Sequence, residues 1–412
     1  MNRRRVVVTG IGLVSPIGND LPTVSHALRH DQHGIRRMSA WADIVNLDTR
    51  LGATADVDLA RWPRKQVRTM GRVALLATSA TEDAVRMAGL ESETLGSGRT
   101  GLAYGSTHGS SSAFEQWARA VFANNGMKGI TSSAYLQFMS HTCAANLALF
   151  FGVKGRVIST CAACVSASQG IGTGYEAIRD GYQDVMICGG AEEMHYTHAG
   201  VFDVMFATSR KYNDRPELSP RPFDANRDGL VVGEGAGTLV LEDFERARAR
   251  GARMYAEVLG YGTNCDGTHV TQPSALGMAG AMRLALTDAR LDAAQIDYVN
   301  AHATATDVGD IAESEATLEV LGAHVPVSST KGFTGHTLGA CGAIEAAFCI
   351  AMMAEGWIAP NRTLERVDPR CAALDYVGRS PLSRELTRTM SNNFAFGGLN
   401  TSLVLGRPPT ES

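Results

Sequence analysis

The sequence predicts an α/β protein built from two similar halves. Short runs rich in β-branched residues alternate with longer alanine-rich stretches, which is the pattern of strands and helices in layered α/β folds. Residues 6–12 (VVVTGIG) and 256–262 (AEVLGYG) each predict a strand that ends in a glycine-rich turn, and each stands at the start of one half. The length of 412 residues exceeds that of a typical single hydrophobic core, so two halves packed together are expected.

The same rhythm of elements runs through both halves, residues 1–254 and 255–412. We expect largely parallel strands covered by helices, because strands and helices alternate. No low-complexity linker separates the halves, so they should pack as one rigid body. The first half is expected to contain strands 5–9, 100–104, 156–160 and 185–189 and helices 72–88 and 166–179. The second half is expected to contain strands 255–261, 296–301, 325–329, 389–393 and 402–405 and helices 279–289 and 338–354.

Composition describes an enzyme-like globular protein. Apolar residues make up 44% and charged residues 19%, which is far from the composition of disordered chains. The net charge of -4 gives no basic excess, so no nucleic-acid surface is expected. Eight cysteines without a recognisable secretion signal predict reduced thiols and a cytoplasmic location. The most apolar stretch, residues 339–357, contains two glutamates, so we expect a buried helix and no membrane span.

Residues 156–167 (RVISTCAACVSA) predict a strand, a tight turn of small residues and a helix that begins near Cys164. A thiol at a helix N-terminus lies at the positive end of the helix dipole, which favours the thiolate and lowers the thiol pKa. Cys164 is therefore a candidate nucleophile, although unpaired cysteines are more often small buried apolar residues. Cys161 and Cys164 form a C-x-x-C, but no second such pair or paired-histidine motif completes a zinc site, so no metal is expected.

Two histidines flank predicted element ends in the second half. His302 follows a predicted strand in residues 296–307 (IDYVNAHATATD), and His336 precedes a predicted helix in residues 327–342 (VSSTKGFTGHTLGACG). Sites of α/β proteins gather at the carboxyl ends of parallel strands, and a helix N-terminus disfavours the imidazolium form of His336. Each histidine alone could be structural. In residues 389–400 (TMSNNFAFGGLN), a glycine loop with Phe396 could present N–H groups to an oxyanion or could be a plain hairpin.

Taken together, these motifs resemble the β-ketoacyl-acyl-carrier-protein synthases of types I and II, in the thiolase superfamily. The resemblance runs from Arg5 to Leu405 and includes residues 222–237 (PFDANRDGLVVGEGAG). It implies the thiolase fold, with duplicated halves in a five-layer α-β-α-β-α sandwich. It also implies decarboxylative condensation of an acyl thioester, carried on Cys164, with malonyl-acyl-carrier protein to give a 3-oxoacyl thioester and CO2.

The resemblance also assigns roles to individual residues. The nucleophile of the family lies eight residues before a glycine that corresponds to Gly172, which selects Cys164 over Cys161 and leaves Cys161 as a packing residue. His302 and His336 are the expected hydrogen-bond donors to the enolate. Lys331 either takes part in catalysis or forms a structural salt bridge. The remaining assignments are oxyanion donors at Cys164 and Phe396, a buried network of Asp310, Glu313 and Glu345 with Lys331, pantetheine contacts at Thr304 and Thr306, and an acyl pocket of Phe202, Met205 and Phe206.

An acidic acyl carrier protein is the implied partner. Five cations lie within residues 61–72 with no acid among them; such a run is usually a solvated helix face, but Lys65 and Arg68 match positions that contact the carrier in the family. No cofactor is expected, because the phosphopantetheine arm belongs to the carrier. The resemblance implies a homodimer, or a heterodimer with a related synthase or chain-length-factor subunit. Residues 68–77 (RTMGRVALLA), 263–273 (TNCDGTHVTQP) and 373–377 (ALDYV) are most similar to synthases of aryl-polyene pathways.

Some features depart from the family or leave alternatives open. Ala303 and Ala395 stand where the family commonly has glycine, which would stiffen the loops beside His302 and Phe396. A reversible disulfide between Cys161 and Cys164 is an alternative for the C-x-x-C. Two other functions remain open: a chain-length-factor-like partner subunit, and a Cys-dependent acyltransferase or thioesterase. The long polar segment 209–228 is expected to be a functional or interface loop.

Overall fold

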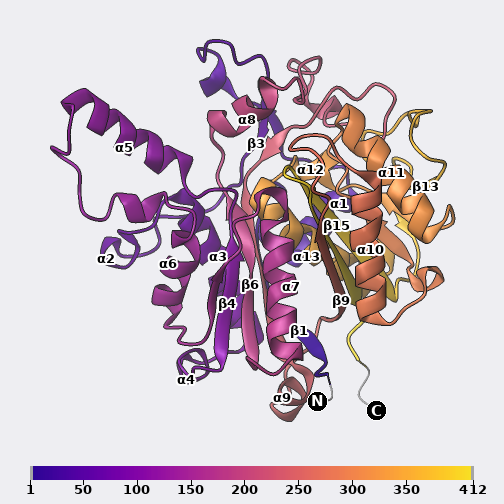
Figure 1. Ribbon diagram of the computed structural model, residues 1–412, viewed down its shortest axis with the longest axis horizontal. Helices are drawn as coiled ribbons and strands as arrows, with labels where there is room; N and C mark the ends of the chain where they lie inside the picture. Colours follow the sequence, from indigo (N-terminus) through magenta and orange to yellow (C-terminus); the bar gives the residue numbers. More distant parts are fainter. Residues whose placement is uncertain (1–2, 410–412) are drawn as a thin grey trace.

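The computed structural model describes residues 3–409 and has helices on both sides of a large strand core (Figure 1). Eleven strands are hydrogen-bonded in the order β13-β11-β10-β15-β16-β9-β1-β8-β6-β4-β5. Their bounds are β1 Val6–Val14, β4 Thr100–Gly105, β5 Val157–Ser159, β6 Val185–Glu192, β8 Gly235–Asp243, β9 Ala256–Cys265, β10 Tyr298–Asn300, β11 Pro326–Ser328, β13 Asp375–Tyr376, β15 Arg388–Ala395 and β16 Leu399–Gly406.

The strands divide into two groups that meet between β1 and β9. All strands on the β1 side come from residues before 244, and all strands on the β9 side come from residues after 255. In the described chain, the strands of the two groups pair with each other only between β1 and β9. Three antiparallel residue pairs, between Val6–Val8 and Ala256–Val258, make up this pairing. The predicted boundary at residue 254 falls between the groups and stays a prediction.

Helices separate and cover the two groups in five layers (Figure 1). The helices α7 and α13 contact each other and strands of both groups, so they form the central layer. One outer face is covered by α3 and α6, and the other by α10 with α11 packed beside it. The predicted α-β-α-β-α thiolase fold is therefore confirmed. The bounds of these helices are α3 Arg72–Ala88, α6 Thr142–Phe151, α7 Ser166–Arg179, α10 Ala275–Ala289, α11 Asp307–Leu321 and α13 Cys341–Glu355.

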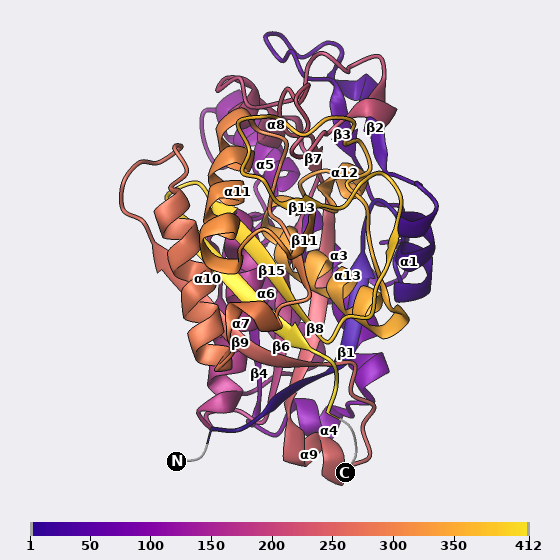
Figure 2. The same ribbon diagram turned by 90° about the vertical axis from the view of Figure 1, so that its right-hand side faces the viewer.

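The shorter elements lie mainly at the two ends of the sandwich. Figure 2 shows α8 and α12 at one end, with β3 and β7, and α4 and α9 at the opposite end. Their bounds are α1 Leu21–Arg29, α2 Arg64–Val67, α4 Ser92–Leu95, α5 Ser111–Asn124, α8 Tyr196–Asp203, α9 Phe244–Ala249 and α12 Lys331–Thr334. Two small sheets are formed by β2 Ile35–Arg37, β3 Leu51–Ala53 and β7 Val232–Gly233, and by β12 Trp357–Ile358 and β14 Leu382–Ser383.

The expectation of largely parallel strands is wrong for the middle of the sheet. There β1 pairs antiparallel with β8 and β9, and β16 pairs antiparallel with β9 and β15. Parallel pairing is confined to the flanks, where β4 lies between β5 and β6 and β10 lies between β11 and β15. The physical reason is the connections, because β15 and β16 are joined by a tight glycine turn and need no crossover helix.

The central layer is closely packed and strongly apolar. A Cβ atom at Gly172 of α7 would lie 2.3 Å from the ring of Tyr261 in β9, so this position accepts no side chain without movement. Residues Leu338–Glu355 are long and apolar enough to cross a membrane by length and composition, but 89% of this stretch is buried inside the fold. It is therefore a core helix, as the interruption of the apolar run by two glutamates predicts.

Candidate active site

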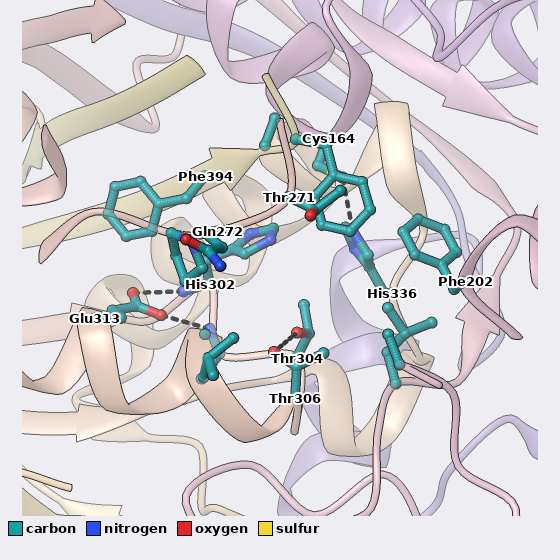
Figure 3. A pocket seen from close by; sticks show the side chains of 18 of the residues that line it. Cys164, Phe202, Thr271, Gln272, His302, Thr304, Thr306, Glu313, His336 and Phe394 are labelled. Carbon is teal, nitrogen blue, oxygen red and sulfur yellow. Dashed lines mark hydrogen bonds between the residues drawn. The ribbon is translucent and has the colours of Figure 1, made fainter. Parts of the chain in front are cut away.

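A cavity of about 480 Å³ brings Cys164, His302 and His336 together (Figure 3). Cys164 comes from the first group of elements, directly before α7, whereas the histidines follow β10 and α12 in the second. One ligand atom from each of the three side chains, the sulfur and two ring nitrogens, lies within 4.8 Å of the others. The site is therefore formed only when the two halves pack together.

Cys164 lies on a strained turn. It is the middle residue of a 3-10 turn, Ala163–Val165, that leads directly into α7. Ala163 has a φ of 49°, a left-handed conformation that is uncommon for a residue with a Cβ atom. The Ser166 hydroxyl fixes the turn, since it accepts a hydrogen bond from the Ala162 N–H at 2.9 Å and lies 2.7 Å from the Ala163 carbonyl oxygen. This backbone directs the thiol into the cavity.

The thiol does not have the low pKa that its helix-start position suggests. Burial raises the pKa of Cys164 to about 12, and the Lys331 charge opposes that rise only in part. Desolvation therefore outweighs the helix dipole, and the resting group is a thiol. The Nε2 atom of His336 lies 3.0 Å from the sulfur and is placed to receive its proton.

Both histidines are neutral. Burial, followed by the charge of Lys331, holds the pKa values of His302 and His336 well below 6.5. Their rings are perpendicular, with centroids 5.0 Å apart. The sequence also predicts a neutral His336, from its place before a helix. In the structure the main cause of its low pKa is burial.

Lys331 is a buried cation behind the site. Its side chain is 1% exposed, and its ammonium pairs with the Glu345 carboxylate. Burial alone would lower the pKa of Lys331, but the acidic groups around it, with Glu345 the strongest, together have the larger opposite effect. The pKa of Lys331 is therefore raised above its ordinary value. The second oxygen of Glu345 accepts a hydrogen bond from the Asn393 amide at 2.7 Å.

The expected buried network of Asp310, Glu313 and Glu345 with Lys331 contains one direct ion pair, and the Lys331 charge also acts on Glu313, where it opposes the rise in pKa that burial causes. Among the described residues, only Glu345 pairs with the Lys331 ammonium. Glu313 instead accepts backbone N–H bonds from His302 and Ala303 at 2.8 and 2.6 Å, and burial raises its pKa to about 8. These bonds fix the His302 loop, as Figure 3 shows.

Asp310 supports the next part of the same loop. It accepts hydrogen bonds from the backbone N–H groups of Phe223 at 2.8 Å and Ala305 at 3.1 Å. Burial raises its pKa to about 6, and Arg227, 3.9 Å away, opposes that rise. Asp310 therefore connects the long 209–228 segment to the histidine loop.

The other residues assigned to the site line the same cavity at different depths. Thr304 and Thr306 line one wall, with their hydroxyl oxygens 3.2 Å apart. Phe202 is buried, and its ring centroid is 5.4 Å from that of Phe396 in the β15–β16 turn. Met205 and Phe206 lie toward the mouth, because Phe206 is 80% exposed.

Lys65 and Arg68 lie outside this cavity. Together with Arg64 they border a second depression, beside Gln137. Two of the five cations in residues 61–72 are used elsewhere, because Arg61 pairs with Glu82 at 2.9 Å and Arg72 with Glu234 at 2.8 Å. Within residues 3–409, Arg64, Lys65 and Arg68 have no acidic partner, and all three are exposed.

Sequence reasoning assigned no role to the β9–α10 loop, although the loop lines the cavity. Asp266, Val270, Thr271 and Gln272 all border it, and Figure 3 shows Thr271 and Gln272 beside the catalytic trio. The loop also contacts the Phe396 turn, where the Gly397 N–H donates to the Val270 carbonyl at 2.8 Å. The only sequence signal was its mixture of Gly, Pro and polar residues, which predicts a turn but not a role.

Three positions singled out in the sequence have defined surroundings. Cys161 is exposed, not packed as expected, and its thiol lies 3.0 Å from the Ser140 carbonyl oxygen while Cys164 faces His336. Both cysteines are free thiols. Ala303 is buried beside Glu313, and Ala395 packs with the apolar residues around Cys164.

Comparison with known proteins identifies relatives along almost the whole chain. Residues 3–247 match the model for the N-terminal domain of β-ketoacyl synthases, and residues 255–365 match the model for their C-terminal domain. The chain is 39% identical to 3-oxoacyl-[acyl-carrier-protein] synthase 1 of Escherichia coli K12, and the match covers 98% of both chains.

Solved structures give the same result. A β-ketoacyl synthase from Burkholderia phymatum STM815 is 49% identical and superposes with a TM-score of 0.95 over 98% of this chain and 100% of that chain. A type II PKS ketosynthase in complex with its acyl-carrier protein, AntDE:AntF, is 27% identical, with a TM-score of 0.90 over 98% of this chain and 100% of that chain.

The buried ion pair yields a stability prediction. Lys331→Met leaves the Glu345 carboxylate buried and unpaired, so we expect a loss of about 3–5 kcal/mol in the free energy of unfolding. The double variant Lys331→Met/Glu345→Gln should recover most of that loss. Urea unfolding followed by circular dichroism measures both values.

A matched surface pair provides the control. Arg283→Met breaks an exposed pair with Glu319 and should cost about 0.2–1 kcal/mol. An equal loss in the Lys331 and Arg283 variants would contradict the assignment of a desolvated charge.

Proposed function

We propose that this chain, which belongs to the β-ketoacyl synthase family, carries its acyl group on Cys164 and activates malonyl thioesters with His302 and His336. The enzyme is a 3-oxoacyl-[acyl-carrier-protein] synthase, which condenses an acyl thioester with malonyl-acyl-carrier protein and releases CO2 and free carrier. The observation that supports the residue roles is the placement of one thiol and two neutral imidazoles within 4.8 Å, next to a buried cation.

Acyl transfer begins with the Cys164 thiol. The sulfur gives its proton to Nε2 of His336, 3.0 Å away, and attacks the carbonyl carbon of the incoming thioester. The backbone N–H groups of Cys164 and Phe396, which border the same cavity, stabilise the oxyanion. When the tetrahedral intermediate collapses, the carrier thiolate leaves and takes the proton, so a thioester on Cys164 replaces the thioester on the carrier.

Decarboxylation then uses both neutral histidines as donors. After acylation no thiol proton faces Nε2 of His336, and the neutral ring shifts its own proton to Nε2 from Nδ1, which has no hydrogen-bond partner among the described residues. Nε2–H of His336 and a ring N–H of His302 then bind the carbonyl oxygen of a malonyl thioester. Loss of CO2 leaves an enolate whose negative charge these two donors stabilise. The enolate carbon attacks the acyl group and expels the Cys164 thiolate, which recovers a proton.

Lys331 acts on this chemistry through its charge. Burial is the main cause of the low pKa values of His302 and His336, and the Lys331 ammonium lowers them further, so both rings are neutral. We propose a positioning role for Lys331, and for Glu313 and Asp310 through the histidine loop. We propose that Thr304 and Thr306 bind the pantetheine arm, which belongs to the carrier, and that the enzyme needs no cofactor or metal of its own.

An acidic carrier protein docks, in this proposal, at the cations of α2. The three exposed cations without acidic partners in the described chain, Arg64, Lys65 and Arg68, form a compact positive surface that suits an acidic partner. The related AntDE:AntF structure is a ketosynthase in complex with its acyl-carrier protein, which supports this kind of partner.

We also propose that the chain forms dimers through the edge of the sheet at β5. This strand lies at one end of the strand order, and the α6 helix beside it exposes Leu149 at 81%. The neighbouring α5 stands out from the body of the molecule with Phe122 80% exposed (Figure 1). An unpaired strand edge next to exposed apolar side chains is typical of an interface.

We further propose that the protein is located in the cytoplasm and acts in an aryl-polyene pathway. Reduced cysteines support the location, and residues 68–77 and 263–273 support the pathway. The partner in the dimer is a second copy or a related chain-length-factor subunit.

The catalytic roles predict separate defects in the two half-reactions. Cys164→Ala should abolish acyl-enzyme formation, and His302→Ala should retain acylation but lower condensation by about 10²–10³-fold, since one donor to the enolate is lost. His336→Ala should slow both steps, because this ring also receives the thiol proton. Intact mass spectrometry follows acylation, and CO2 release follows condensation.

Three outcomes would contradict this scheme. Full condensation in either histidine variant would exclude the two-donor mechanism. Release of free acid alone by the wild-type protein would instead support the thioesterase alternative, and a protein that is never acylated would support the chain-length-factor alternative.

The docking surface predicts a defect that depends on the carrier. Lys65→Glu/Arg68→Glu should raise KM for carrier-bound substrate on the order of 10-fold and leave the rate with a pantetheine thioester unchanged, because only the protein partner meets these charges. Steady-state kinetics with the two substrate forms measures the difference. Arg253→Glu, an exposed cation before β9, is the control, and equal effects in both variants would argue against docking at α2.

The edge-strand interface predicts a change in oligomeric state. Val157 is 45% exposed on β5, and Val157→Lys places a charge on the proposed interface. We expect this variant to be monomeric, whereas Val45→Lys, at a loop residue that is 84% exposed, keeps the wild-type mass. Sedimentation velocity of the chain alone gives the masses, and a wild-type chain that stays monomeric until mixed with a related subunit would favour the heterodimer.

A further inference from the structure

The three reacting side chains also form a set of metal ligands (Figure 3). The sulfur of Cys164 and one ring nitrogen each of His302 and His336 lie within 4.8 Å of one another. Among residues 3–409, no other three cysteine, histidine or carboxylate side chains come together in this way. Zn²⁺ prefers such thiolate and imidazole ligands, whereas Mg²⁺ and Ca²⁺ prefer oxygen ligands. We call Cys164, His302 and His336 the ligand trio.

Small side-chain movements bring the ligand trio to the spacing of a tetrahedral ion. A zinc ion about 2.3 Å from a sulfur and about 2.0 Å from each nitrogen separates its ligand atoms by about 3.3–3.6 Å. In the structure the sulfur lies 3.0 Å from Nε2 of His336, slightly closer than this spacing. The widest separation, within the limit of 4.8 Å, exceeds the spacing by at most about 1.5 Å, which two side chains share by rotation.

The ligand trio leaves one position of the tetrahedron open. All three residues line the cavity of about 480 Å³, so a water molecule from the cavity can be the fourth ligand. Three protein ligands with one open position are typical of accessible zinc sites, whereas structural zinc sites have four protein ligands. The open position and the cavity mouth give an ion a way in and out.

The surroundings of the two rings favour a reversibly bound ion over a permanent one. Histidines of resident metal sites usually donate their second ring N–H to a carboxylate or a carbonyl oxygen, which raises metal affinity. Nδ1 of His302 and Nδ1 of His336 are buried and have no hydrogen-bond partner among the described residues. The ligand trio therefore has suitable ligands but lacks the outer contacts that hold a resident metal.

The charges around the ligand trio permit a divalent cation. When the metal binds, the Cys164 thiol loses its proton to water, and the resulting thiolate cancels one of the two charges of the ion. The Lys331 ammonium opposes a further cation, but its charge is offset by the buried Glu345 carboxylate with which it pairs. The site thus gains one positive charge, not two.

We propose that the ligand trio of the resting enzyme binds Zn²⁺ reversibly and that the bound ion blocks acylation. The ion occupies the sulfur that attacks the thioester and Nε2 of His336, which receives the thiol proton. Acylation in turn removes the thiolate, so the ion and the acyl group exclude each other. The inhibition rests on the proposed function, whereas the metal binding does not.

Co²⁺ tests the binding independently of catalysis. The full chain, reduced and free of metal, is titrated with Co²⁺, whose complexes with thiolates absorb light in the near ultraviolet. We expect this absorption at about one ion per chain and its loss when Zn²⁺ displaces Co²⁺. Cys164→Ala should abolish the absorption. His302→Ala should weaken binding at least about 10-fold, because even the loss of an outer contact costs 10–100-fold in affinity.

The exposed thiols provide the control. Cys161→Ser/Cys265→Ser removes both exposed cysteines of the described chain and should leave the absorption unchanged. If this variant loses the absorption and Cys164→Ala keeps it, or if the wild-type protein never shows it, the inference is overturned. Should His302→Ala not fold, the wild-type protein acylated on Cys164 replaces it, since the acyl group removes the thiolate and should abolish the absorption.

Inhibition of acylation tests the consequence. Zn²⁺ should slow acylation by a pantetheine thioester in competition with the thioester, and a chelator should restore the rate. His302→Ala retains acylation under the proposed function, so it should need at least about 10-fold more Zn²⁺ for the same inhibition. Equal inhibition of both proteins would show that zinc acts on the thiol alone and would overturn the inference. If Co²⁺ binds but the metal-free protein is never acylated, the proposed function fails and the metal site stands.

Discussion

The buried charge of Lys331 is the constraint on which the catalytic site depends. An ammonium inside a protein is costly unless it is paired, and Glu345 with Asn393 behind it supplies that pairing. The charge acts on all three reacting groups, since it lowers the pKa values of Cys164, His302 and His336. On the histidines it adds to burial, which keeps them neutral. On the thiol it opposes burial, so the thiolate is less unfavourable than desolvation alone would make it.

The position of this charge follows from the fold. Lys331 begins α12 and Glu345 lies in α13, so the pair connects the second half to the central layer. Cys164 approaches the same layer from the first half on its strained turn before α7. Among the described strands of the large sheet, the two halves pair only between β1 and β9. The packing of α7 against α13 therefore holds the nucleophile and the histidines in place relative to each other.

Much of this arrangement is predictable from the sequence, because local patterns encode local structure. Helices 72–88 and 166–179 match α3 and α7 in both bounds. His302 follows strand β10 and His336 precedes the helix α13, as the alternation of elements predicts. The strand β8 was missed because its glycines, Gly235 and Gly237, resemble a loop; a Cβ atom at Gly237 would lie 2.7 Å from the backbone of α13. Antiparallel pairing in the middle of the sheet was missed because it depends on partners far apart in the chain.

The electrostatics were less predictable than the positions. A cysteine at the start of a helix suggests a low pKa, but that rule holds where the thiol reaches water, and here burial reverses the direction. The partners of Glu313 and Asp310 could not be read from the sequence either, because both carboxylates accept backbone N–H groups, which no residue pattern reveals. Side-chain identity predicted the members of the site, and three-dimensional packing determined their charges.

A protonated resting thiol imposes an order on the reaction. Burial raises the pKa of Cys164 to about 12, so the resting enzyme carries little thiolate at neutral pH. The thiol proton moves to His336 only when the sulfur attacks the carbonyl carbon of a bound thioester. Once the acyl group is attached, the sulfur has no proton to give, so His336 can carry its own ring proton on Nε2 and donate a hydrogen bond to the second substrate. The same imidazole thus serves the first half-reaction as an acceptor and the second as a donor, and a change of ring tautomer after acylation separates the two roles.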